Sequence, residues 1–224
     1  MKKIFAVIVL LVTSVSLFSQ SDVTQFLGIP VDGFKPDMIR KLKEKGFVSS
    51  EYDKNILEGE FNGQDVHIYI VTNNNKVYRI MVADKNTISE TDIKIRFNSL
   101  CRQFANNSKY TTFFSNVDDY IIPEDEDISY EMIVNNKRYE AIFYQRTDSI
   151  VMQNDARNYV LKKYTEEEQS DSTNVEKIFK ETMFYMMEAI TKKSVWFKIS
   201  EFHGKYYITM YYDNEYNKAN GEDL

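Results

Sequence analysis

Residues 56–83 read ILEGEFNGQDVHIYIVTNNNKVYRIMVA, and this stretch contains two β-hairpins in succession. Asn62-Gly63 and the run Asn73-Asn74-Asn75 tolerate the left-handed backbone of tight turns, so they separate three predicted strands. The turns fix the register, and the register gathers the apolar residues of the three strands on one face. That face consists of Leu57, Gly59, Val66, Ile68, Ile70, Tyr78, Ile80 and Val82.

Two more hairpins are predicted further along the chain. Asn135-Asn136 joins Ile128–Val134 to Lys137–Tyr144, and His203-Gly204 joins Val195–Phe202 to Lys205–Tyr212. The last hairpin again collects its apolar residues on one face: Val195, Phe197, Ile199, Ile208, Met210 and Tyr212. An antiparallel sheet with one apolar face needs a covering layer on that face.

Three amphipathic helices are predicted to form the covering layer. The first opens with Pro36, which suits a first helical turn, and ends at Gly46, which favours the left-handed C-cap. The second begins at Ser89, which forms a capping-box-like pair with Asp92. Its apolar residues share one helical face: Ile93, Phe97, Leu100, Cys101 and Phe104. The third helix covers about 175–190. We therefore predict an α+β fold with all three helices packed on one face of the antiparallel sheet.

A short echo connects the two halves of the chain. Glu60-Phe61-Asn62-Gly63 and Glu201-Phe202-His203-Gly204 each close a predicted hairpin. The echo suggests two helix-plus-meander units of common ancestry, at about 20–112 and 113–224. Tight turns by themselves select the same residue types, so similarity without common ancestry is an open alternative. The acidic stretch Thr165–Thr173 is the best candidate for a linker or a mobile loop.

The first residues are typical of a secretory signal peptide. Two lysines precede an unbroken apolar run from Ile4 to Val12, and small polar residues follow it. A membrane-spanning helix needs about 20 mostly apolar residues, and this run ends earlier. We expect cleavage after Ser19, which removes residues 1–19 and leaves 20–224 as the exported chain, in the periplasm or outside the cell. A lipoprotein needs a cysteine at its new N-terminus, and the only cysteine is Cys101, so no lipid anchor is expected.

Three segments resemble a known group of proteins. FLGIPVDG at Phe26–Gly33, LKEKGF at Leu42–Phe47 and NKANGEDL at Asn217–Leu224 resemble uncharacterised secreted proteins of Bacteroidetes. The resemblance implies export and brings no known activity. Gly33 before an amphipathic helix is also similar, more loosely, to helix-plus-meander modules such as β-lactamase inhibitor protein and the small outer-membrane assembly lipoprotein. That likeness implies protein binding by analogy of fold.

The composition argues against several classes of partner. The formal net charge is −6, and lysines and arginines do not cluster, which argues against nucleic acid and anionic membrane as partners. A single cysteine cannot form an internal disulfide, so packing alone must hold the fold. No phosphate-binding glycine loop, nucleophile elbow or zinc-protease pattern occurs in the sequence.

Residue types that often carry catalysis or bind metals are scarce. His67 is predicted to face Glu58 across its hairpin, and His203 is placed in a turn. Cys101, on an apolar helical face, reads as a buried, unreactive thiol. The acidic residues between Asp118 and Asp127 are hard Ca²⁺ ligands, but the spacing of a calcium loop is missing, which favours a solvated acidic loop. We predict no catalytic residues, no metal and no cofactor.

One polar face carries an unusual set of aromatic residues. With His203-Gly204 as the turn, Trp196 opposes Tyr211, and Tyr207 opposes Ser200, all on the side away from the apolar face. Amphipathic aromatics on a half-exposed face are typical of protein interfaces and sugar-binding platforms. The alternative is that these aromatics simply favour strands and pair across them. Trp196, Tyr207 and Tyr211 are therefore the candidate partner-binding residues, for a protein or a glycan.

Three function classes remain open from the sequence. The favoured one is an exported binding module without catalysis. The alternatives are a hydrolase that acts on envelope or host polymers through paired carboxylates, and a purely structural envelope protein. A deep pocket with two converging carboxylates would favour the hydrolase, and a shallow sheet face with Trp196, Tyr207 and Tyr211 would favour the binder.

The signal peptide gives a direct prediction. In a host that exports the protein, mass spectrometry of the envelope and secreted fractions should find an N-terminus at Gln20 or within a few residues of it. An intact Met1 on protein recovered from those fractions would contradict both the cleavage and the predicted location.

Overall fold

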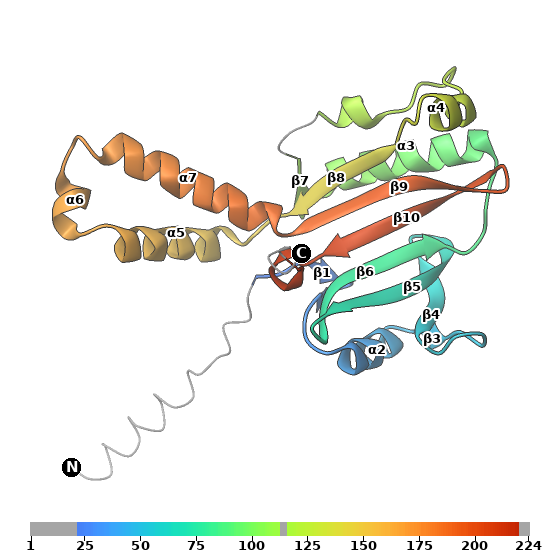
Figure 1. Cartoon of the computed structure of the whole chain (residues 1–224), viewed down its shortest axis with the longest axis horizontal. Helices are drawn as coiled ribbons and strands as arrows, with labels where there is room; N and C mark the ends of the chain where they lie inside the picture. Colours follow the sequence, from blue (N-terminus) through green and yellow to red (C-terminus); the bar gives the residue numbers. More distant parts are fainter. Residues whose placement is uncertain (1–21, 113–115, 220–224) are drawn as a thin grey trace, which may run out of the picture.

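The computed structural model describes residues 22–112 and 116–219 and shows an α+β fold with antiparallel sheets (Figure 1). The proposed signal peptide and the last five residues of the NKANGEDL ending lie outside the described residues. Along the chain the elements are β1 (Gln25–Phe26), β2 (Ile29–Pro30), α2 (Lys35–Glu44), β3 (Val48–Ser49), β4 (Ile56–Phe61), β5 (Gln64–Asn73), β6 (Lys76–Asp84), α3 (Glu90–Asn106), β7 (Tyr110–Thr111), η1 (Val117–Tyr120), α4 (Ile128–Val134), β8 (Glu140–Gln145), α5 (Ser149–Lys163), α6 (Glu166–Ser170), α7 (Val175–Thr191), β9 (Ser194–Phe202), β10 (Lys205–Asp213) and η2 (Glu215–Asn217).

Two meanders form one continuous eight-stranded sheet. The strand order is β3-β4-β5-β6-β10-β9-β8-β7, so the two groups of four strands meet where β6 pairs with β10. β1 and β2 form a separate two-stranded hairpin. In this order β6 and β10 occupy equivalent places in the two meanders, and so do β5 and β9, so the β9–β10 turn corresponds to the β5–β6 turn. Of the two similar sequences, Glu201–Gly204 lies at the β9–β10 turn, whereas Glu60–Gly63 lies at the β4–β5 turn. The two similar sequences therefore occupy turns that are not equivalent in the topology.

Turn chemistry explains the echo. Asn62 and Gly63 have φ values of 51° and 72°, and His203 and Gly204 have 51° and 71°, so both turns use the same left-handed pair. A common origin of the two meanders stays a hypothesis that rests on their shared strand order. The link between β8 and β9, which corresponds to the tight β4–β5 turn, instead carries the helices α5, α6 and α7.

The predicted registers of the hairpins at Asn62-Gly63 and His203-Gly204 are confirmed. Leu57 pairs with Ile68 and Met210 with Phe197, and the inner-face side chains of these strands are buried. One inner-face residue was predicted wrongly. The register shifts beside Val71, which places Val77 opposite Thr72 and leaves Tyr78 as the extra residue of a bulge. Val77 is therefore fully buried in the place expected for Tyr78.

Helices α2 and α3 cover the inner face, as predicted. α2 packs on β5 and β6, and α3 packs on β10, β9 and β7. Ser89 caps α3 by accepting a hydrogen bond from the Asp92 amide at 3.2 Å. The predicted apolar face of α3 is the buried one: Ile93, Phe97, Leu100, Cys101 and Phe104.

The third predicted helix does not cover the sheet. α7 exists almost as predicted, but it packs mainly on α5, and α5, α6 and α7 form a helical arm that projects from the sheet (Figure 1). α5 was missed, although Asp148 accepts hydrogen bonds from the Ile150 and Val151 amides as an N-cap. The predicted linker at Thr165–Thr173 contains α6, which Thr165 and Glu168 begin with a reciprocal capping box.

The predicted hairpin at Asn135-Asn136 is wrong. Residues Ile128–Val134 form α4, and the following strand, β8, begins only at Glu140. Asp127 caps α4 by accepting a hydrogen bond from the Tyr130 amide at 2.8 Å. Ile128 is fully buried. The N-cap at Asp127 and the burial of Ile128 therefore stabilise a helix here instead of a strand.

Gly59 gives a stability prediction for the sheet. A Cβ atom on this inner-face glycine would lie 2.5 Å from Cδ1 of the buried Phe47 ring. Gly59→Ala should therefore lower the free energy of unfolding by about 1–3 kcal/mol through overpacking. Glu60→Ala, at the exposed neighbouring position, should change it by less than about 0.5 kcal/mol. Equal costs for the two variants in chemical denaturation would contradict the close approach of Phe47 to the β4 backbone.

Candidate functional site

The outer face of the sheet is the surface on which the sequence places the candidate aromatic residues. Trp196 lies opposite Tyr211, and Tyr207 lies opposite Ser200, as predicted. β6 completes the face from the other half of the sheet, because Tyr211 also pairs with Met81, and Met81 with Tyr69. The side chains that point outward here are mostly half-buried, in contrast to the fully buried inner face.

A shallow hollow of about 410 Å³ lies on this outer face, over β5, β6, β9 and β10. Tyr207 and Tyr211 both line it, whereas Trp196 stands beside it through its contact with Tyr211. The hollow is lined by His67, Tyr69, Met81, Ala83, Asp84, Lys85, Thr87, Lys198, Ser200, Phe202, Tyr207, Thr209 and Tyr211. Rings, short hydroxyl side chains and lysines thus share one open surface.

Trp196 and Tyr211 belong to a cluster that the sequence did not predict in full. Their rings stack with centroids 4.0 Å apart and planes 15° apart. The Arg79 guanidinium lies 4.9 Å from the Tyr211 ring and donates to both carboxylate oxygens of Asp213, at 2.5 and 2.6 Å. The Trp196 indole N–H donates to the same carboxylate at 3.0 Å. Tyr211 is only 9% exposed and Asp213 only 2%, so this end of the face is largely dehydrated.

The charges of the cluster support one another. The hydrogen bonds from Arg79 to Asp213 raise the pKa of the guanidinium above its usual value, so the cation is permanent. Asp213 is almost completely buried, and with Arg79 and Trp196 as donors its carboxylate is well satisfied. Burial raises the pKa of Tyr211, so its hydroxyl stays protonated. The cluster suits a structural edge of a binding surface more than an acid or a base.

The carboxylates around the hollow are held by cations. Asp84 accepts two hydrogen bonds from Arg96 of α3, at 2.6 and 2.8 Å. Glu58 binds Lys85 at 2.7 Å, a hydrogen bond that lowers the pKa of this carboxyl, and it lies 3.5 Å from His67. The predicted pairing of His67 with Glu58 is therefore confirmed.

The other candidate groups have structural surroundings. Burial raises the pKa of the Cys101 thiol to about 12, which keeps it protonated at neutral pH. His203 lies in its turn with a left-handed backbone, as predicted. Within residues 22–112 and 116–219, no group of three or more His, Cys, Asp or Glu side chains is arranged to hold a metal ion.

Three acidic residues of the predicted loop between Asp118 and Asp127 form local hydrogen bonds. Asp119 accepts from the Asn116 amide at 2.9 Å, and Asp127 caps α4. Glu126 accepts hydrogen bonds from both Lys137 and Tyr139, and Lys137 and Tyr139 hold its pKa below the usual value against the opposing effect of burial. These contacts give Asp119, Glu126 and Asp127 local structural roles.

A second concave region lies on the helical side of the sheet. A cavity of about 520 Å³ opens between the ends of α2 and α3, with Phe47, Phe61 and Phe104 among its walls. A neighbouring cavity of about 390 Å³ shares several lining residues with it. Leu27 lines both and has a φ of 52°, an unusual conformation for a bulky residue.

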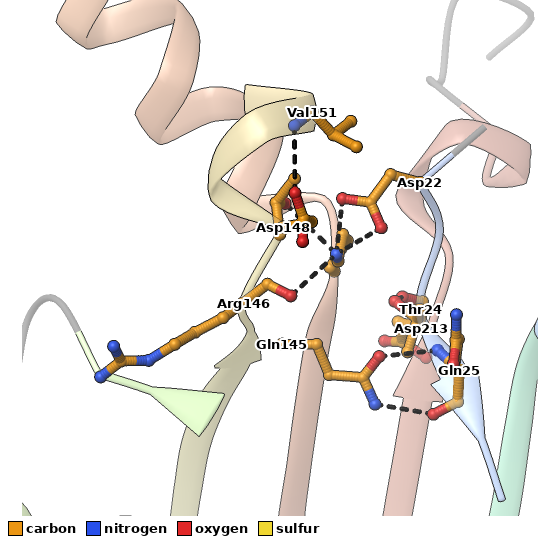
Figure 2. Close-up of polar contacts among 10 residues, drawn as sticks. Asp22, Thr24, Gln25, Gln145, Arg146, Asp148, Val151 and Asp213 are labelled. Atoms are coloured by element: carbon orange, nitrogen blue, oxygen red, sulfur yellow. Dashed lines mark hydrogen bonds and ion pairs between the residues drawn. The ribbon is translucent and has the colours of Figure 1, made fainter. Parts of the chain in front are cut away.

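The root of the helical arm is built around Lys193, which the sequence analysis did not single out. The amine of this buried lysine donates to both carboxylate oxygens of Asp22, at 2.7 and 2.8 Å, and to Thr147 at 3.2 Å. Figure 2 shows Asp22, Arg146 and Asp148 gathered where the N-terminal segment meets the start of α5. Gln145 adds a reciprocal pair of hydrogen bonds with the backbone of Gln25, each 2.7 Å. The base of the arm is thus fixed to the sheet and to the N-terminal segment.

Several apolar side chains of α7 are exposed to solvent. We call the α7 stripe the exposed residues Val175, Phe179, Met183, Phe184 and Met187. Phe179 is 64% exposed and Phe184 is 71% exposed. The apolar pattern that predicted α7 is therefore real, but part of it faces solvent instead of the sheet.

Comparison with known proteins finds no match. No protein-family model, curated protein or solved structure is similar to this chain. The resemblance to secreted proteins of Bacteroidetes and the looser likeness to helix-plus-meander binding modules therefore stay hypotheses. No helix in the described part of the chain is long and apolar enough to cross a membrane.

Asp213 gives the prediction that tests the cluster. Asp213→Ala would leave Arg79 and the Trp196 indole N–H without their buried acceptor, and it should cost about 3–5 kcal/mol of unfolding free energy. Glu176→Ala, which removes an exposed pair with Lys180, should cost less than about 0.5 kcal/mol. Urea unfolding followed by circular dichroism compares the two, and a cost below about 1 kcal/mol for Asp213→Ala would contradict the cluster's structural importance.

Proposed function

We propose that this protein is an exported binding module without catalysis that recognises a protein partner through the outer face of its sheet. The observation that carries the proposal is the contrast between the two faces. Helices cover the inner face, and the outer face presents a hollow of about 410 Å³ that Tyr207 and Tyr211 line, with Trp196 beside it. Aromatic side chains in such a setting supply most of the binding energy at protein interfaces.

The arrangement of carboxylates favours binding over hydrolysis. Each of the three cavities described above is lined by a single carboxylate: Glu60, Asp22 or Asp84. Hydrolysis of glycosides needs two carboxyl groups that face one bond from opposite sides. Asp84 is bound by Arg96, and Asp22 by Lys193, so neither is free to act as an acid or a base. The hydrolase alternative therefore lacks a site among these cavities.

A protein partner is favoured over a glycan by the apolar part of the hollow's lining. Met81, Ala83 and Phe202 line the hollow beside the tyrosines, and such side chains suit an apolar protein surface and cannot hydrogen-bond the hydroxyl groups of a sugar. A purely structural envelope protein would need no half-exposed aromatic hollow. Export itself rests on the signal-peptide pattern at the N-terminus, as predicted from the sequence.

The proposal is tested at Tyr207, which lines the hollow and is separate from the buried cluster. A photo-reactive benzoylphenylalanine at position 207 should cross-link a defined protein in the envelope of the native host. The same group at Arg102, which is exposed on α3, should not capture that protein. Once the partner is purified, Tyr207→Ala should weaken its affinity by about 5–30-fold, the usual scale for an interface aromatic.

Two results would contradict the proposal. Cross-linking that is equal at positions 207 and 102 would show that the outer face has no partner. Binding to glycans on an array, lost in Tyr207→Ala, would replace the protein partner with a sugar. Circular dichroism must show that Tyr207→Ala remains folded, which we expect because Tyr207 is only half-buried.

A further inference from the structure

The helical arm is incomplete as a packed unit. α7 has seventeen residues, and none of them is buried; α5 buries only Ala156. A helix that is apolar on more than one side is normally enclosed by neighbours on those sides. The arm supplies one neighbour, α5, and Figure 1 shows the hairpin extending away from the sheet. One side of α7 therefore lacks a packing partner within the described chain.

The two sides of α7 are distinct. Tyr185 stacks on Tyr159 of α5 with centroids 4.4 Å apart, and Glu181 binds Lys163 of α5 at 2.6 Å, so these positions face the hairpin partner. Residues of a helix lie 100° apart around its axis, which places Met183 and Met187 about 160° from Tyr185. Met183 and Met187 thus lie opposite the contact with α5. Phe179, Val175 and Phe184 flank them, at about 120°, 80° and 100° from Tyr185 around the helix axis.

Four residues of the stripe form one ridge. Val175, Phe179, Met183 and Met187 follow each other at intervals of four. Ridges of this spacing also pack into the grooves between the i±3 rows of a second helix at about 20°, which is the geometry of most four-helix bundles. The charged pair Glu176–Lys180 lies beside the ridge at 2.7 Å, and both side chains are mostly exposed, so they belong to the polar rim of a contact at the ridge.

The area of the stripe matches the centre of a protein interface. From the exposed fractions of its five side chains, the stripe presents roughly 400–500 Å² of apolar surface, the size of the largest apolar patch on a typical monomer, which is often functional. A standard interface buries about 800 Å² on each partner, with an apolar centre and a polar rim. The exposed lysines and glutamates of α7 supply such a rim.

We propose that the α7 stripe is the interface with a second copy of this chain, in which two α7 helices pack antiparallel about a two-fold axis near Met183. The ridge is suited to this symmetry, because Phe179 and Met187 lie four residues on either side of Met183. The axis therefore places Phe179 of one copy against Met187 of the other, and Met183 against itself. The two α5–α7 hairpins then form a four-helix assembly, which encloses the side of α7 that α5 leaves open.

The shape of the molecule permits this contact. The arm projects clear of the sheet, so two arms can meet without contact between their outer sheet faces (Figure 1). The antiparallel arrangement also opposes the dipoles of the two α7 helices. The inference uses no part of the sheet hollow, so it stands or falls independently of the proposed partner surface.

The first test measures the oligomeric state of the chain that begins at Gln20 and keeps every described residue. Sedimentation equilibrium should show a dimer, and Met183→Glu should raise its dissociation constant by about 30-fold or more, as expected for a charge at the centre of an interface. Ile150→Glu is the matched control, because Ile150 is an exposed apolar residue of α5 outside the stripe. It should leave the dimer intact.

A second test keeps the inference falsifiable if Met183→Glu fails to fold. Met183→Cys should form an intermolecular disulfide rapidly under mild oxidation, because the axis brings the two thiols together, and the native Cys101 is buried and does not compete. Ile133→Cys, exposed on α4, should not. A folded monomer at about 100 μM, or a dimer that Met183→Glu does not weaken, would overturn the inference. A monomer that binds lipid vesicles through Phe179 would overturn it as well.

Discussion

Strand β10 holds the structure together, because among the described strands its pairing with β6 joins the two meanders into one sheet. It pairs with β6 of the first meander through Met210 and Tyr212 and with β9 of the second along nearly its whole length. Its last residue, Asp213, binds Arg79 of β6 and Trp196 of β9 with one carboxylate. Both faces depend on this strand: the inner face carries the core, and the outer face carries the hollow.

The parts of the fold that could be predicted are those that neighbouring residues in the sequence decide. Asn62-Gly63 and His203-Gly204 fix the registers of their hairpins, because few residue pairs tolerate two successive left-handed conformations. The bulge at Tyr78 was not predictable, because it leaves the apolar pattern of β6 almost unchanged. The prediction of a strand at α4 is wrong, because its few apolar residues fit both the helical period of 3.6 residues and the strand period of two. The N-cap at Asp127 is the feature that distinguishes the helix. The packing partner of α7 could not be predicted for another reason. An apolar helical face indicates that the face is buried, but it does not identify the element that covers it.

In the candidate site, too, the contacts set by neighbouring residues could be predicted and the contacts between distant residues could not. The opposition of Trp196 and Tyr211 follows from a single turn, so the sequence was enough to predict it. Arg79 and Asp213 lie 134 positions apart and meet only because β6 is next to β10, a pairing that no local pattern encodes. Lys193 and Asp22 are separated by 171 positions, and their contact depends on the path of the N-terminal segment across the root of the arm. Long-range pairs of this kind become visible only when the order of the strands is known.

The central position of β10 also determines when the sheet can close during folding. The strand at the middle of the sheet is the last of the described strands along the chain, and it must wait for the strands on either side of it, β6 and β9. Contacts between residues that are far apart in the chain form slowly, because the chain between them loses conformational entropy before the new strand pairing stabilises it. A chain that emerges from a ribosome N-terminus first therefore cannot complete its core until β10 (Lys205–Asp213) is out. The first meander must spend that time with its β6 edge unpaired, dependent on chaperones or on speed to avoid pairing with a neighbour.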